Sequence, residues 1–424
     1  MLDKFLRLSV GLLVGTLVAR YLGPDQFGML NYAIAVATIF GGVGMLGLDA
    51  ILVKNLVQKP DESGQVLGTA FILRIFGGFI AVAATMAATL TLNPGESNMH
   101  LLAAIAAAST TIKGLDLVRF YFESKVNSKY TVIAETSAFL VSSLVKLLLI
   151  GTSSPLLLFS CVLVLETLIS LVIQTWFFRQ KDETKHPWVF NSSTAKRLVA
   201  ESWPLIFSGL AIIAYMKTDQ IMLGKMLGND SVGIYSAATR LSEIWYLFPV
   251  IIAQSYFPSL LQDKSRNHEE FTQKIQRLMD GMVALAISIA IPVSLLSPWI
   301  IRFLYGEAFS SAALVLQIHI WGAVFVFLGV IAGRWYLSNN LQHLTIQRSI
   351  FGLIFNVVLN VLLIPKLGVS GAAIATVCAH FVGSYLANSL NRETREIFFI
   401  QTNSLLLPVR GANMLWRRLR NWPQ

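Results

Sequence analysis

The stretch GMVALAISIAIPVSLLSPWII (residues 281–301) decides the fold class of this chain. It holds 21 residues without a single charge, and about 20 consecutive apolar residues are needed for a helix to cross a bilayer. Pro292 and Pro298 are expected to kink this helix, which a bundle tolerates when neighbouring helices satisfy the freed backbone groups. The sequence therefore predicts a membrane span here.

The whole composition agrees with this prediction. Of the 424 residues, 55% are hydrophobic and only 13% are charged, whereas soluble domains carry about 25% charged residues. So few charges cannot cover a water-soluble surface of this size. We predict an all-α polytopic membrane protein with about 12 transmembrane helices in two six-helix lobes around a central cavity. No segment is long enough to form a separate catalytic domain, so we expect no enzyme.

The expected helices follow from the hydropathy along the chain. They lie near residues 3–21, 29–52, 67–92, 99–122, 128–150, 155–178, 200–222, 233–258, 279–302, 312–336, 346–364 and 370–390. This pattern divides the chain into an N-terminal six-helix lobe with a linking loop (1–196), a C-terminal six-helix lobe (197–390) and a basic cytoplasmic tail (391–424).

Loop charges predict the orientation. Of the 33 Lys and Arg residues, 22 lie at the termini or in loops after even-numbered helices, and 4 lie in loops on the opposite side. Cytoplasmic loops carry the excess of Lys and Arg, so both termini are predicted to be cytoplasmic. The net charge of +10 therefore reflects membrane topology, and we expect no nucleic-acid partner.

The two halves of the chain share a short motif. LGPDQFG (22–28) follows the first predicted helix and LGNDSVG (227–233) follows the seventh, and both read L-G-x-D-x-x-G. Six helices per half return the chain to the same side of the membrane, so the halves are predicted to be parallel repeats. Similar turn chemistry arising by chance remains an alternative.

Thirteen charged residues fall inside predicted spans, where each costs about 2.5–3.5 kcal/mol on insertion scales. The cations are Arg74, Lys113, Arg119, Lys146, Lys217, Arg240 and Arg334, and the acids are Asp49, Asp116, Glu135, Glu166, Asp219 and Glu243. They are interpreted either as ion pairs that hold the bundle together or as the lining of a hydrated, net cationic cavity for an anionic substrate. Lys113, Asp116 and Arg119 are spaced three residues apart, so we expect them to share one stripe of the predicted helix 99–122.

The apparent catalytic motifs lack their structural context. GVGMLG (42–47) matches G-x-G-x-x-G but lies in a hydrophobic span with no preceding strand, so close helix packing is the better interpretation. SLVK (143–146) matches S-x-x-K without its companion motifs. Because no P-loop is present, we expect no ATP-driven step, no metal site and no cofactor beyond a coupling ion.

Several segments of the chain are typical of one family of membrane proteins. They are LVARYLGPDQFG (17–28), LGLDAILV (46–53), YMKTDQIMLG (215–224), VGIYSAA (232–238) with RLSE (240–243), and PKLGVSGAA (365–373). Together they resemble the Wzx-type O-antigen flippases, the polysaccharide biosynthesis membrane proteins of the multidrug/oligosaccharidyl-lipid/polysaccharide exporter superfamily. The resemblance covers residues 1 to about 390.

The resemblance implies a flippase that moves undecaprenyl-pyrophosphate-linked oligosaccharide to the periplasmic leaflet of the bacterial inner membrane, for O-antigen and lipopolysaccharide. It also implies alternating access driven by H+ or Na+, and a polysaccharide polymerase and chain-length regulator as partners. The candidate substrate-binding residues are Arg7, Arg74, Lys113, Arg119, Lys217, Arg240 and Arg334, and the candidate ion-coupling residues are Asp49, Asp116 and Asp219. A cation-coupled drug exporter of the same superfamily is the main alternative, and an integral-membrane polysaccharide polymerase or ligase is a weaker one because no large outward loop is predicted.

Overall fold

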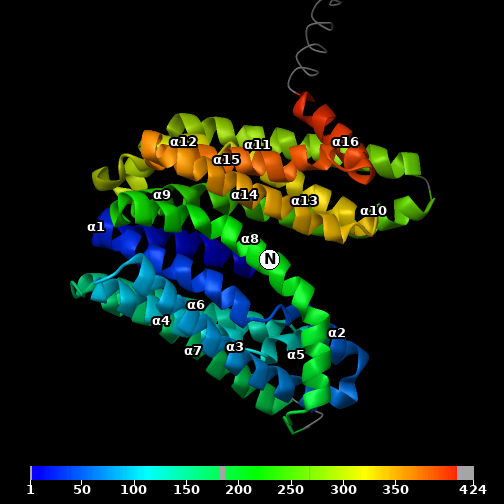
Figure 1. Cartoon of the computed structure of the whole chain (residues 1–424), viewed down its shortest axis with the longest axis horizontal. Helices are drawn as coiled ribbons and strands as arrows, with labels where there is room; N and C mark the ends of the chain where they lie inside the picture. Colours follow the sequence, from blue (N-terminus) through cyan, green and yellow to red (C-terminus); the bar gives the residue numbers. More distant parts are fainter. Residues whose placement is uncertain (1, 182–186, 267, 408–424) are drawn as a thin grey trace, which may run out of the picture. The chain divides into compact units, whose positions relative to one another are not determined.

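The computed structural model describes residues 2–181, 187–266 and 268–407. Over these residues the chain is helical and contains no strand, which confirms the all-α prediction (Figure 1). Among them, 10 helical segments are long and apolar enough to cross a membrane, and one of these, Leu6–Gln58, covers two of the predicted spans. The predicted span 233–258 is formed by two consecutive helices that are absent from those 10 segments. The chain forms two compact units, Met1–Ile234 and Tyr235–Gln424.

The first unit is built around its N-terminal helix, whose main contacts are with four other long helices of the unit. Its elements are α1 (Leu2–Gly44), α2 (Asp49–Gln58), η1 (Pro60–Glu62), α3 (Ser63–Leu92), α4 (Ser97–Gly114), α5 (Val118–Ser124), α6 (Lys129–Gly151), α7 (Leu156–Lys181), α8 (Ser192–Leu227) and the start of α9 (Asn229–Glu243). Helices α3, α4, α6 and α8 all pack on α1.

The repeated motif adopts the same backbone conformation in both halves of the chain. Gly23 has φ 72° and ψ 170°, and Gly228 has φ 91° and ψ 177°. Residues with a Cβ rarely adopt this conformation, and a new helical segment starts directly after each glycine. The agreement supports the internal repeat over chance similarity.

The last glycines of the two motifs lie against each other inside the first unit. A Cβ on Gly28 would lie 1.8 Å from the carbonyl oxygen of Asn229, and a Cβ on Gly233 would lie 2.0 Å from that of Pro24. Only glycine allows the two backbones to approach so closely. The motif therefore encodes both a turn and a helix contact.

Small residues also explain the G-x-G-x-x-G sequence. Gly44 ends α1, and a Cβ there would lie 2.8 Å from the carbonyl oxygen of Gly77 in α3. On α3 a buried stripe of small residues faces the bundle, while Phe76, Phe79 and Ile80 are exposed on the other side. A helix that is apolar all round with one face uncovered is what a lipid environment requires, and the helix-packing interpretation of the glycines is confirmed.

The buried core of the second unit lies mainly between the helices at residues 268–305, 322–338 and 395–405. Its elements are the rest of α9, η2 (Ile244–Tyr246), α10 (Leu247–Arg266), α11 (His268–Tyr305), η3 (Glu307–Phe309), α12 (Ala312–His319), α13 (Gly322–Ser338), α14 (Gln342–Leu367), α15 (Val369–Ser384), η4 (Leu386–Ser389), η5 (Arg392–Thr394) and α16 (Arg395–Leu405). Helices α14 and α15 form an antiparallel pair joined at Gly368, which has φ 62°.

The start of the basic tail belongs to this core. Ile397 and Ile400 of α16 are buried in the same cluster as Met279 of α11 and Phe327 of α13. The residues after 407 lie outside the described part of the chain. The division at 196/197 follows the sequence repeat and stays a prediction, whereas the compact units meet at residues 234 and 235, because α8 packs on α1 and α3.

Candidate functional site

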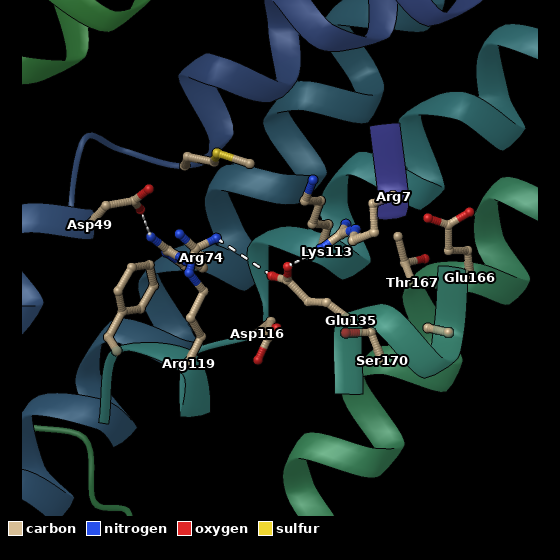
Figure 2. A pocket seen from close by; sticks show the side chains of 13 residues that line it. Arg7, Asp49, Arg74, Lys113, Asp116, Arg119, Glu135, Glu166, Thr167 and Ser170 are labelled. Atoms are coloured by element: carbon tan, nitrogen blue, oxygen red, sulfur yellow. Dashed lines mark hydrogen bonds and ion pairs between the residues drawn. The ribbon is translucent and has the colours of Figure 1, made fainter. Parts of the chain in front are cut away.

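A cavity of about 200 Å³ inside the first unit is lined by charged side chains from seven helices and the turn after α4 (Figure 2). We refer to it as the charged cavity. Its lining is Arg7, Met45, Asp49, Arg74, Lys113, Asp116, Arg119, Phe120, Glu135, Ala138, Glu166, Thr167 and Ser170. Six of the ten candidate residues from the sequence are therefore brought together here.

Arg74 is the most deeply buried charge of the cavity. Its side chain is 3% exposed, and Nη1 donates to the carbonyl oxygen of Gly114 over 2.6 Å while Nη2 pairs with Asp49. The guanidinium also lies 5.1 Å from the ring centroid of Phe120. Gly114 is the last residue of α4, so its carbonyl has no partner within the helix. Arg74 thus ties α3 to the end of α4 and to the start of α2.

Glu135 of α6 connects two cations of the cavity. Its Oε2 accepts from Nη1 of Arg7 over 2.6 Å, and its Oε1 lies 3.9 Å from Nη1 of Arg119 (Figure 2). Arg119 also pairs with Glu123 of the same helix over 2.9 Å. The carboxylate of Glu135 is therefore shared between guanidiniums of α1 and α5.

Lys113 differs from these arginines. Its side chain is exposed at the end of α4, and it has no hydrogen bond or ion pair with any residue in the described part of the chain. An ammonium group that lines a cavity without a partner is free to contact a bound anion.

The remaining carboxylates have polar partners on neighbouring helices. Gln174 of α7 donates to Oδ2 of Asp116, while Oδ1 of Asp116 is buried and accepts no hydrogen bond within the described residues. Glu166 of α7 accepts from Ser142 over 2.6 Å and lies 3.6 Å from Nζ of Lys146.

The helical stripe predicted for Lys113, Asp116 and Arg119 is wrong. Helix α4 ends at Gly114, residues 115–117 form a turn, and α5 begins at Val118. The turn brings all three side chains to the cavity without helical periodicity. The buried guanidinium of Arg74 lies at the end of α4, where it donates to the carbonyl oxygen of Gly114.

The other four candidates lie outside the charged cavity. Lys217 and Asp219 are on α8, where Lys217 is half-buried and Asp219 is buried. Arg240 is on α9 and Arg334 on α13, and the guanidinium of Arg334 lies 5.4 Å from the ring centroid of Phe257. Their roles in substrate binding and ion coupling stay predictions.

The sequence identified Glu135 and Glu166 only as acids inside predicted spans and assigned them no role in substrate binding or ion coupling. Glu135 is 128 residues from Arg7 in the chain, and no pattern in the sequence relates them. The lining now has four cations and four carboxylates. Arg7, Arg74 and Arg119 form ion pairs in this cavity, whereas Lys113 has no ion pair among the described residues, and their roles in substrate binding stay predictions.

A second cavity of about 620 Å³ in the same unit contrasts with the first. It lies at the kink of α1, at the start of α4 and at the turn before α7, and Tyr21, Asp25, Gln26 and Asn98 are among its lining residues. No Lys or Arg is among the described residues that line it. Arg7 of α1 and Lys113 of α4 line the charged cavity instead.

Comparison with known proteins identifies the family of this chain. The family model described as "Polysaccharide biosynthesis protein" matches residues 4–264, more than half of the chain. The chain belongs to the polysaccharide biosynthesis protein family. A second model, MatE, matches residues 204–362.

Two named relatives align over most of the chain. The probable low-salt glycan biosynthesis flippase Agl15 of Haloferax volcanii is 23% identical over 92% of this chain and 83% of its own length. The capsular polysaccharide biosynthesis protein CapF of Staphylococcus aureus is 23% identical over 90% of this chain and 93% of its own length.

The fold also has a solved counterpart. The lipid II flippase MurJ, in an inward closed conformation, matches with a TM-score of 0.73 over 100% of this chain and 93% of that chain, at 16% identity. The all-helical transporter fold with two lobes expected from the sequence is therefore confirmed. The expectation of a non-enzymatic membrane protein is also in line with relatives that are named as flippases.

Proposed function

We propose that this protein is a flippase that moves a lipid-linked oligosaccharide across the membrane for the synthesis of a surface polysaccharide. The observation that carries the proposal is a cavity of paired and unpaired cations inside a lipid-exposed helical bundle, in a chain of the polysaccharide biosynthesis protein family. The names of the relatives Agl15 and CapF, a flippase and a capsular polysaccharide biosynthesis protein, support the same direction.

The proposed substrate carries its glycan on undecaprenyl pyrophosphate, and the proposed product is O-antigen for lipopolysaccharide. A diphosphate and its sugars cannot cross hydrocarbon unaided, because desolvating charged and polar groups costs several kcal/mol each. Guanidinium groups bind phosphate oxygens in a bidentate manner, and an ammonium group adds a compact charge. Arg7, Arg119 and Lys113 supply these groups, while the lipid tail stays in the bilayer.

The position of the charged cavity along the helices supports loading from the cytoplasm. Glu135 lies six residues after the start of α6, which corresponds to about 9 Å along the helix axis. Lys125 and Lys129 flank this helix end, on the side that the excess of basic loops assigns to the cytoplasm. In this proposal the protein is in the bacterial inner membrane with both termini in the cytoplasm.

The energy source in this proposal is an ion gradient, with the protein acting as an antiporter. Asp49 is already paired with Arg74, whereas Asp116 has a buried oxygen without a hydrogen-bond donor in the described residues. Burial disfavours the charged form of a carboxylate. We therefore place proton coupling at Asp116 ahead of Asp49, with Asp219 as a further candidate. The proposed partners are a polysaccharide polymerase and a chain-length regulator.

The second candidate function is cation-coupled drug export, because the MatE model matches residues 204–362. A drug exporter for cationic substrates would require acidic groups free to contact them. In the charged cavity Glu135 and Glu166 already contact cations. We therefore place this function second.

Translocation by the purified protein tests the proposal. Proteoliposomes containing the full chain are loaded with a fluorescent undecaprenyl-pyrophosphate oligosaccharide, and a membrane-impermeant lectin reports the label that reaches the other leaflet. We expect translocation by the wild type, a loss in Arg119→Ala and partial recovery in Arg119→Lys, because Lys lacks the bidentate fork. If the wild type expels cationic dyes but leaves the labelled lipid in place, the drug-export function replaces this one.

A further inference from the structure

The charge balance of the charged cavity constrains how an anion binds there. Its four cations face four carboxylates, so the described lining has no formal excess of positive charge. A diphosphate that enters this cavity as it stands would meet repulsion from the carboxylates as well as attraction from the cations. Moving one carboxylate away from its cations would remove part of this repulsion.

Glu135 is placed to be that carboxylate. Its two oxygens face guanidiniums of different helices, 2.6 Å from Arg7 and 3.9 Å from Arg119. A phosphate group also presents two oxygens to two donors in this way. Asp49 is held by the buried Arg74, and Glu166 lies with Ser142 and Lys146 at the far side of the cavity (Figure 2). Neither of them joins two guanidiniums within the described structure.

We propose that the Glu135 carboxylate occupies the position of the substrate's diphosphate in the empty cavity, and that the diphosphate displaces it to bind Arg7, Arg119 and Lys113. This inference rests on the proposed function and adds the residue that the substrate must displace. Figure 2 shows the Glu135 side chain between those of Arg119 and Arg7.

The displacement gives the cavity a means of selecting its ligand. A diphosphate diester carries two negative charges and replaces one, which increases the attraction to the three cations. The phosphodiester of an ordinary phospholipid carries one charge, and its exchange for a carboxylate brings little electrostatic gain. Glu135 thereby excludes the abundant bilayer phospholipids and admits a diphosphate. The carboxylate also keeps two half-buried guanidiniums paired when no substrate is bound.

The test is anion binding to the full-length protein in nanodiscs of zwitterionic lipid, measured by titration calorimetry. The probes are inorganic pyrophosphate and dimethyl phosphate. Glu135→Gln should bind pyrophosphate about tenfold more tightly than the wild type, which corresponds to about 1.4 kcal/mol. It should also bind dimethyl phosphate, which the wild type should not.

Glu62 provides a matched control. It also contacts two cations, Lys59 at 2.9 Å and Arg197 at 3.5 Å, but it does not line the charged cavity. Glu62→Gln removes the same charge from the same unit and should leave both affinities within about twofold of the wild type. An equal gain in both variants would overturn the proposal, because it would reflect the overall charge of the protein.

Unchanged or weaker pyrophosphate binding by a folded Glu135→Gln protein would also overturn it. If that variant does not fold, Glu135→Asp keeps the charge but withdraws the carboxylate by one methylene. Glu135→Asp should bind pyrophosphate about threefold more tightly than the wild type, and unchanged binding would refute the proposal. If the wild type translocates the labelled lipid but the affinity for pyrophosphate is unchanged in these variants, only the role of Glu135 is refuted. Tighter pyrophosphate binding without any lipid translocation refutes the proposed function and leaves the anion site.

Discussion

Arg74→Lys separates the structural role of this arginine from the substrate contact expected from the sequence. In the structure, the guanidinium of Arg74 is buried and divided between the Gly114 carbonyl and the Asp49 carboxylate. One ammonium group cannot satisfy both at their present positions, because Lys lacks the planar fork. The substitution should therefore cost stability whether or not a substrate is present.

The size of the loss follows from the two contacts. A buried carbonyl left without a donor costs about 1–3 kcal/mol. Asp49 is 59% exposed, so its ion pair contributes only about 0–1 kcal/mol. The two contributions sum to about 1–4 kcal/mol, which lowers the unfolding temperature by at least about 2 °C.

The assay is thermal unfolding of the purified protein in detergent, together with its abundance in the membrane. The matched control is Arg119→Lys, because Arg119 is 43% exposed and its pair with Glu123 can be kept by Lys. Arg119→Lys should unfold within about 1 °C of the wild type. If Arg74→Lys is equally stable but does not translocate the labelled lipid, Arg74 contacts the substrate and the structural role is refuted.

Three further predictions follow from the fold and the cavity. Gly28→Ala should prevent stable accumulation of the protein, since its Cβ would lie 1.8 Å from a backbone oxygen, at a cost above about 3 kcal/mol. At Gly281 a Cβ has open space, so Gly281→Ala should accumulate normally. Membrane abundance measures both variants. A reporter enzyme fused at Ser154 should be active only in its periplasmic form and one at Glu269 only in its cytoplasmic form, and the reverse result would refute the orientation from the loop charges. Lys113→Gln should keep wild-type abundance and unfolding temperature but lower lipid translocation at least about tenfold, and full activity would remove this residue from the site.

The sequence by itself determined the membrane class, the repeat and most of the helices. Hydropathy predicts spans well because, in lipid, each helix satisfies its backbone hydrogen bonds within a single segment. The stretch at residues 281–301 therefore forms part of α11 as expected. The repeated glycines were also readable, since Gly23 and Gly228 adopt a conformation that depends on local sterics.

Only the tertiary structure decided which charges share a cavity. Helical periodicity was the wrong basis for Lys113 and Arg119, because the helix ends between them and Arg74 of another helix binds the free carbonyl. The pairing of Glu135 with Arg7 depends on how α6 packs on α1. Contacts between helices arise from the shape of whole faces, such as the approach of Gly44 to Gly77, and not from local spacing. A charged side chain in a membrane span needs a partner, but only the packing of the helices decides which residue that partner is.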